Sequence, residues 1–179
     1  MMIQEKDGHK VINGSAIEAL KEIQNESIDL IFADPPYNIG KKYNGKKITW
    51  ETEESYLNWC YEWIVLCLKK LKPNGTFYLM NSTQNIPYLD IYLRNKVEIL
   101  SRIVWHYDSS GVQAKNYFGS LYEPILHCVK DEKNYKFNSD DILVEAKTGS
   151  KRKLIDYRKS PPQPYNTKKV PGNVWYIPR

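Results

Sequence analysis

The chain has 179 residues, of which 41% are hydrophobic and 26% are charged. This balance is that of one globular domain and excludes an intrinsically disordered chain. No apolar run is long enough to span a membrane, and the polar start of the chain argues against a signal peptide. The cysteines, Cys60, Cys67 and Cys128, form no CxxC pair, so we expect no metal site and a reducing, cytoplasmic location.

The net charge of +5 is concentrated in the C-terminal part of the chain. Residues 147–179 contain nine Lys or Arg side chains and one acidic side chain, Asp156. Such a segment predicts a surface that binds a polyanion. A solvated tail without a partner is the alternative that charge alone leaves open.

In chain order, a short strand is expected at 11–12 and a helix at 16–23, where apolar residues recur at helical spacing. Ser15 is the expected N-cap of this helix. Residues 28–33 form a nearly continuous apolar run, which is typical of a central parallel strand buried on both faces. That strand must end at Asp34-Pro35-Pro36-Tyr37, because two prolines cannot continue a ladder of hydrogen bonds.

Residues 38–50 are rich in Lys and Gly and predict a mobile loop. Pro73-Asn74-Gly75 predicts a turn, and Pro87 fits the first turn of a helix. An apolar stripe that includes Tyr56, with acidic residues in the first turn and lysines in the last, predicts a helix at 53–71. A strand at 76–80, a helix at 84–95 and two strands at 99–107 and 124–129 follow. This order predicts an α/β fold with a mostly parallel sheet and helices on both faces. Ligands bind such sheets at the carboxyl ends of the strands, where the sequence places both Asp34 and Asn81-Ser82.

The Asp34-Pro35-Pro36-Tyr37 turn offers a specific set of groups to a ligand. The prolines stiffen the backbone and lack N–H donors, so the Asp34 carboxylate and the Pro35 carbonyl can act as neighbouring acceptors. Two acceptors suit the two hydrogens of an exocyclic amine, and the Tyr37 ring can hold a planar heterocycle by its face. A nitrogen bound in this way becomes pyramidal, and its lone pair can attack an activated methyl group. A base within a duplex would have to flip out to reach the turn.

The run Asp-Leu-Ile-Phe-Ala-Asp-Pro-Pro-Tyr-Asn-Ile-Gly at residues 29–40 resembles motif IV of the amino-methyltransferases that act on DNA with S-adenosylmethionine. Asp34 at the start of its Asp-Pro-Pro-Tyr core is typical of adenine-N6 enzymes, whereas cytosine-N4 enzymes usually carry Ser there. Residues 145–175 are similar to the YhdJ-type adenine methyltransferases. Other blocks that resemble the family lie at residues 71–76, 80–83, 102–105, 109–115 and 122–126.

This resemblance implies a partial Rossmann-like methyltransferase sheet and S-adenosylmethionine as the cofactor. Asp34 and Pro35 would bind the adenine N6, Pro36 would keep the turn rigid, and Tyr37 would stack on the flipped base. Ser15 and Asp34 would contribute to the cofactor pocket, where the family usually has Asp in place of Ser15. Double-stranded DNA would be the partner, held by Lys41, Lys42, Lys115, Lys147, Lys151, Arg152 and Lys153.

The resemblance also implies a division of the chain. Residues 1–146 would form the catalytic half, and residues 147–179 a basic DNA-contact region and a linker. The cofactor-binding half follows the catalytic half in this permuted subgroup, so we expect a sheet that is incomplete at its C-terminal side and a chain that is inactive alone. A partner chain would complete the sheet if the enzyme is split. The alternatives are an inactive DNA-binding remnant, cytosine-N4 methylation, and methylation of RNA or protein.

Overall fold

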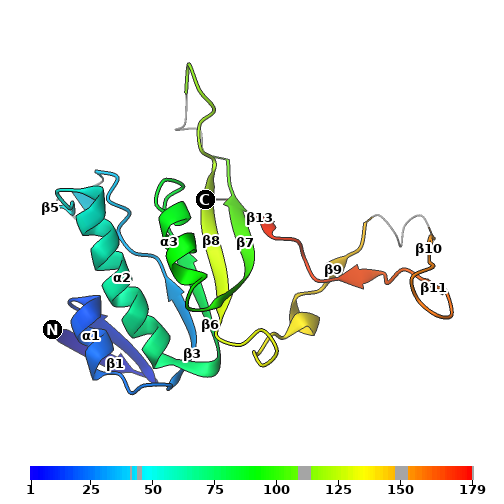
Figure 1. Cartoon of the computed structure of the whole chain (residues 1–179), viewed down its shortest axis with the longest axis horizontal. Coiled ribbons are helices and arrows are strands. Elements are labelled where there is room, and N and C mark those ends of the chain that lie inside the picture. The colour runs from blue at the N-terminus through cyan, green and yellow to red at the C-terminus, as the bar shows by residue number, and fades with distance from the viewer. Residues whose placement is uncertain (41, 44–45, 109–113, 148–152, 179) are drawn as a thin grey trace. The chain divides into compact units, whose positions relative to one another are not determined.

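The computed structural model describes residues 1–40, 42–43, 46–108, 114–147 and 153–178. The chain forms two compact units, one of Met1–Lys136 with Val174–Arg179 and one of Phe137–Asn173 (Figure 1). The boundary that we predicted between residues 146 and 147 lies inside the second unit.

The larger unit is built on a five-stranded sheet in the order β13-β7-β8-β6-β3. These strands are β3 (Ile28–Ala33), β6 (Leu71–Met80), β7 (Glu98–His106), β8 (Tyr122–Val129) and β13 (Val174–Tyr176). β3 is parallel to β6 and β13 is parallel to β7, whereas β8 is antiparallel to both of its neighbours. The sheet is therefore mixed, with parallel pairs at its two ends. Part of the expected linker forms β13.

β3 lies at the edge of this sheet, with β6 as its neighbour among the described residues (Figure 1). Leu30 and Phe32 are 57% and 53% exposed, whereas Ile31 and Ala33 pack partly against the main core. We expected a central strand buried on both faces. That expectation is wrong for the described structure, because no described helix covers the side of β3 that carries Leu30 and Phe32.

The Pro73-Asn74-Gly75 segment lies within β6 and does not form a separate turn. It is accommodated as an irregularity in the register between β6 and β3. Gly75 is needed there because a Cβ at this position would lie 2.9 Å from the Asp29 carbonyl oxygen. β6 ends at the same edge of the sheet as β3, because Ala33, the last residue of β3, pairs with Leu79.

The main core forms where α1 (Ala16–Glu22), α2 (Glu53–Lys70) and α3 (Ile86–Leu93) pack on one face of the sheet. Ser15 caps α1 as predicted, and Thr52 and Ser55 form a capping box at the start of α2. The opposite face carries a smaller cluster, Met80, Ile103 and Ile125, and no described helix. The helices that we expected on both faces are thus present on one face of the described structure.

Two antiparallel strands, β1 (Met2–Lys6) and β2 (His9–Asn13), form a hairpin outside the main sheet. The predicted strand at 11–12 lies in β2. β1 was not predicted, because its residues are mostly polar and all exposed. Asp7-Gly8 was the available signal, since their φ values of 51° and 78° make the two-residue turn of a hairpin. The expected loop at 38–50 contains a second small hairpin, β4 (Lys42–Tyr43) with β5 (Lys46–Lys47).

The smaller unit consists of short elements. They are η1 (Ser139–Ile142), β9 (Val144–Glu145), β10 (Ile155–Asp156), β11 (Gln163–Pro164) and β12 (Lys168–Lys169). β9 pairs with β12 and β10 with β11, both antiparallel. Asp156 is buried and accepts hydrogen bonds of 2.8 and 3.0 Å from the Arg158 guanidinium, which stabilise the turn after β10.

Candidate active site

Four strands of the larger unit, β3, β6, β7 and β13, end at one edge of the sheet. β3 and β6 are parallel, and β7 has the same direction because β6 and β7 are both antiparallel to β8. Asp34 directly follows β3, Asn81 directly follows β6, and the loop after β7 leaves from the same edge. The predicted turn therefore lies where α/β sheets bind their ligands.

The Asp34-Pro35-Pro36-Tyr37 turn folds so that its first and last side chains meet. The Tyr37 hydroxyl donates a hydrogen bond of 2.6 Å to Asp34 Oδ1. The Tyr37 ring packs against Met80, Ile103 and Ile125 on the sheet face opposite the helices. Asp34 is exposed, so its carboxylate is accessible to a ligand.

Buried polar side chains donate hydrogen bonds to the backbone of the turn from the side of the core. Tyr56 Oη on α2 donates to the Pro36 carbonyl oxygen at 2.9 Å and accepts from Asn81 Nδ2 at 2.8 Å. Asn85 Nδ2 donates to the Tyr37 carbonyl oxygen at 2.8 Å and to Asn81 Oδ1 at 3.0 Å. Burial is the main cause that raises the pKa of Tyr56 well above its usual value, so the hydroxyl keeps its proton. Sequence reasoning placed Asn81 at a strand end but counted Tyr56 as part of an apolar stripe.

A cavity of about 690 Å³ lies beside the turn and is lined by α1, β3 and α2. Ser15 and Asp34, the two residues predicted to contribute to a cofactor pocket, both line it. Part of the remaining wall is aromatic, with Trp50, Trp59 and Trp63, and most of the rest is aliphatic. Its volume is that of a pocket for a small molecule or cofactor.

Lys115, a predicted DNA contact, lies in the loop between β7 and β8, at the same edge as Asp34. It is exposed, and so are the rings of Tyr117 and Phe118 beside it, the first at 77% and the second completely. Exposed rings next to a cation are suited to nucleic acid, because rings stack on bases and ammonium groups pair with phosphates.

In the smaller unit, Lys147 lines a hollow of about 410 Å³ that is rich in positive charge. The acidic group in its wall, Asp156, forms an ion pair with Arg158. The other cations in the wall are Lys159, Lys168 and Lys169. This excess of positive charge is suited to a phosphate-bearing partner.

The remaining predicted DNA contacts are described in part or not at all. Lys153 is exposed, and the backbone of Lys42 lies in β4. Lys41, Lys151 and Arg152 lie outside the described residues. Within the described ranges, no cluster of His, Cys, Asp and Glu could hold a metal ion, and no helix is long and apolar enough to cross a membrane.

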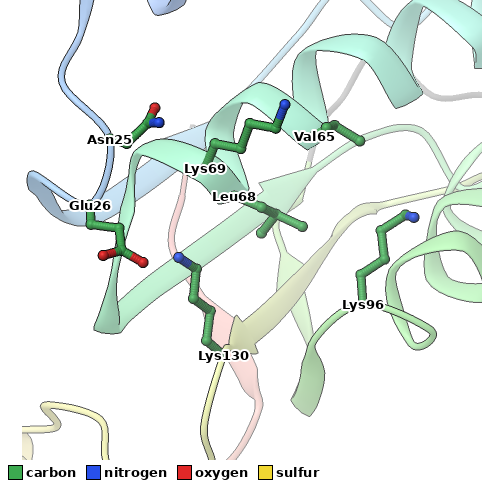
Figure 2. Close-up of a pocket in the computed structure, with 7 residues that line it drawn as sticks. All are labelled: Asn25, Glu26, Val65, Leu68, Lys69, Lys96 and Lys130. Atoms are coloured by element: carbon green, nitrogen blue, oxygen red, sulfur yellow. The ribbon is translucent and has the colours of Figure 1, made fainter.

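A second pocket of the larger unit, of about 560 Å³, lies at the amino end of β3, away from the turn (Figure 2). Glu26, in the loop before β3, lines it together with Lys69, Lys96 and Lys130. Lys130 Nζ donates to the Leu71 carbonyl oxygen at the end of α2. Lysines at a helix C-terminus offset the negative end of the helix dipole, so these charges have a structural explanation.

An exposed carboxylate at the carboxyl end of a parallel strand, next to a cavity of cofactor size, is the arrangement of a ligand-binding α/β domain. A DNA methylase family model that covers adenine-N6 and cytosine-N4 enzymes matches residues 28–179. The chain belongs to this DNA methylase family.

Two relatives illustrate the match. The chain is 60% identical over 169 residues to the DNA adenine methyltransferase YhdJ of Escherichia coli (strain K12), covering 94% of this chain and 57% of that protein. It is 31% identical to the type II methyltransferase M.BamHI of Bacillus amyloliquefaciens, over 83% of this chain and 35% of that protein. The chain therefore spans about half the length, or less, of these curated relatives.

Solved structures share the fold. The PvuII DNA methyltransferase, described as cytosine-N4-specific, superposes with a TM-score of 0.62 at 18% identity, over 92% of this chain and 55% of that one. A putative DNA modification methylase from Thermus thermophilus gives a TM-score of 0.52 at 18% identity, over 92% of this chain and 66% of that one. At these identities the likeness concerns the fold and does not distinguish adenine from cytosine as the target.

Proposed function

We propose that the chain is the catalytic half of a DNA adenine-N6 methyltransferase, which methylates the exocyclic amine of a flipped-out adenine. The observation that carries the proposal is the Asp34 carboxylate, exposed at the carboxyl end of β3 and already accepting a hydrogen bond from Tyr37. An adenine amine would donate to the same carboxylate, with the Pro35 carbonyl as second acceptor. The name of the 60% identical relative, a DNA adenine methyltransferase, supports the same substrate.

The proposed chemistry follows from these acceptors. Asp34 and Pro35 would hold the two amine hydrogens, which localises the lone pair on nitrogen and stabilises the positive charge that develops there. The N–C bond would form as the bond from the methyl group to the sulfonium sulfur breaks, and the amine would then lose one proton. Tyr37 would stack on the base, which requires its hydroxyl to leave Asp34.

S-adenosylmethionine would supply the activated methyl group. The cavity beside the turn supports this cofactor, because it joins Asp34 and Ser15 to an aromatic wall of Trp50, Trp59 and Trp63. These rings suit the adenine and thioether parts of the cofactor. Few polar side chains line the cavity, so we propose that other residues bind the ribose and amino-acid groups.

DNA contact is proposed for both units. Lys115 with its exposed aromatic neighbours supports contact near the target base, and the basic hollow around Lys147 supports contact with phosphates. The other residues remain predictions from the sequence: Lys41, Lys42, Lys151, Arg152 and Lys153. A cytoplasmic location is part of the same proposal.

A further methylase segment, in the same polypeptide or in a partner chain, would complete the sheet beside β3. The exposed Leu30 and Phe32 support this, because a long apolar strand at a free edge is a template for another strand. The shorter span of this chain relative to its relatives also supports it.

The test is to titrate residues 1–179 with S-adenosylmethionine by calorimetry and to measure transfer of tritiated methyl groups to DNA. We expect weak cofactor binding and no transfer by these residues alone. Both should be restored when the remaining methylase half is supplied as a separate polypeptide. Tight one-to-one cofactor binding by residues 1–179 alone would contradict the need for a second half. DNA binding without transfer, even in the restored complex, would favour an inactive DNA-binding remnant.

A further inference from the structure

We propose that Tyr56, Asn81 and Asn85 are positioning residues, which determine which oxygen atoms of the turn face the target base. The inference rests on the proposed methyl transfer and extends it to side chains that do not touch the base. The network they form is a set of hydrogen bonds from rigid elements of the fold to the backbone of the turn.

The network engages the second half of the turn. The Pro36 carbonyl accepts from Tyr56, and the Tyr37 carbonyl accepts from Asn85, so both carbonyls are turned toward the interior. The Pro35 carbonyl receives no hydrogen bond from the described residues. Proline fixes φ at Pro36 but leaves ψ free, so anchoring the Pro36 and Tyr37 carbonyls restricts the remaining freedom of the turn. We infer that the Pro35 carbonyl then faces outward beside the Asp34 carboxylate.

The three side chains come from elements that do not move independently. Tyr56 lies on α2 and is buried in the main core, at 1% exposure. Asn81 follows β6, and its Oδ1 also accepts from the backbone N–H of Ser82 at 2.8 Å. Asn85 lies at the start of α3, but its side chain makes no capping hydrogen bond to that helix. Its Nδ2 instead donates to the Tyr37 carbonyl oxygen and to Asn81 Oδ1.

The burial of these polar groups indicates that their hydrogen bonds, and not only their volume, matter for the structure. Asn81 and Asn85 are 0% and 6% exposed, and a buried amide or hydroxyl is destabilising unless all of its polar atoms have partners. Here the partners are the Pro36 and Tyr37 carbonyls and one another. An apolar side chain would fill the same volume without the polar cost but would leave the turn carbonyls unfixed.

A small displacement of the turn is expected to have a large effect on rate. A misplacement of about 1 Å in a reacting group can reduce the rate roughly 10²-fold. The network therefore predicts that changes behind the turn lower kcat. The KM for the cofactor should change less, because Tyr56, Asn81 and Asn85 do not line its proposed cavity.

The first experiment uses the complete, methylation-competent enzyme. Tyr56→Phe removes one hydroxyl and keeps the ring, and Asn85→Ala removes the second donor without removing a helix cap. Tyr61→Phe is the matched control, since Tyr61 lies on the same helix and stacks on Tyr92 at 3.9 Å without contacting the turn. We expect kcat to fall roughly 10- to 100-fold in Tyr56→Phe and Asn85→Ala, by the positioning argument above, and to be unchanged in Tyr61→Phe. A wild-type kcat in both variants would overturn the proposal.

The second experiment needs no activity and uses residues 1–179 with 13C-labelled carbonyls. Tyr56→Phe should move the carbonyl resonance of Pro36, and Asn85→Ala that of Tyr37, while Tyr61→Phe moves neither. Unchanged resonances with an intact fold by circular dichroism would refute the network. If wild-type enzyme methylates no DNA but these resonances move as expected, the proposed function fails while the positioning of the turn carbonyls stands.

Discussion

The Tyr37 hydroxyl and Asp34 Oδ1 are joined by a hydrogen bond of 2.6 Å across the turn. The carboxylate oxygen that we assign to the adenine amine is thus already bound by the side chain assigned to the face of the base. A phenolic hydroxyl and an exocyclic amine are both donors, so they compete for the same acceptor. The two proposed roles of Tyr37, stacking and release of Asp34, can be separated by substitution.

Tyr37→Phe should bind the flipped base at least as well as the wild type, because the ring remains and the competing hydroxyl is gone. Tyr37→Ala should lose stacking, worth about 1–3 kcal/mol. The measurement is the fluorescence of 2-aminopurine at the target position of a DNA duplex bound to the complete enzyme. Equal loss of binding in both variants would mean that the hydroxyl, and not the ring, holds the base.

Asp34→Ala should abolish most methyl transfer without unfolding the protein, because Asp34 is exposed and lies outside the core. Loss of one preorganised contact to a developing charge typically lowers the rate roughly 10²–10³-fold. Incorporation of tritiated methyl groups into DNA by the complete enzyme is the readout. Asp29→Ala, an exposed carboxylate on the same strand but bound to Lys72, is the matched control and should retain turnover. Near-normal turnover by Asp34→Ala would exclude the assignment.

Replacing Lys151, Arg152 and Lys153 together with Ala should weaken DNA binding and make it less sensitive to salt. Each lost phosphate contact should reduce the slope of log K against log salt concentration by about 0.9. The control removes Lys10 and Lys21, which pair with Glu5 and Glu18 in the N-terminal part of the chain. DNA-binding titrations at several salt concentrations measure this slope. An unchanged slope in the triple variant would show that residues 151–153 do not contact phosphates.

Asp90→Asn should destabilise the larger unit in a pH-dependent manner. Asp90 is buried on α3 and forms ion pairs with Arg102 of β7 and with Arg94. The hydrogen bond from Arg102 is the main cause that holds the pKa of Asp90 below its usual value. Because the folded pKa is lowered, the stabilisation is present above the unfolded pKa, near 4, and is lost as the pH falls through the folded pKa.

We therefore expect Asp90→Asn to reduce the free energy of unfolding by about 1–3 kcal/mol at pH 7 and by less at pH 3. Urea denaturation of both proteins at the two pH values measures the difference. Asp29→Asn, which breaks an exposed pair with Lys72, should have a smaller effect that disappears in high salt. A penalty for Asp90→Asn that does not change with pH would mean that Asp90 contributes by packing and not by its charge.

The sequence predicted those parts of the fold that local patterns determine. The apolar run of β3 followed by Asp34-Pro35-Pro36-Tyr37 predicted both the strand and its end, because prolines cannot continue a ladder. The stripe of α2 and its charged ends predicted that helix almost to the residue. Strand direction could not be predicted in this way, because an apolar run has the same pattern in a parallel and in an antiparallel strand. β8 is in fact antiparallel to both of its neighbours.

The candidate site was predictable to a similar extent. The turn could be identified because its four residues are contiguous and chemically unusual. The network behind it could not, because Tyr56, Asn81 and Asn85 come from different elements and meet only in the folded chain. Tyr56 also fits the apolar periodicity of α2, so nothing in the sequence distinguishes its hydroxyl from that of a tyrosine used only for packing.

Three tryptophans are close neighbours in the wall of the cavity beside Asp34. The ring of Trp50 lies 4.6 Å from that of Trp59, and Trp59 lies 6.0 Å from Trp63. The backbone N–H of Trp50 donates to Asn38 Oδ1, directly after the turn. Indoles at these separations couple electronically, so their near-ultraviolet circular dichroism and emission depend on their mutual orientation. The protein thus carries an intrinsic optical reporter, with which the filling of this cavity can be followed in solution without a label.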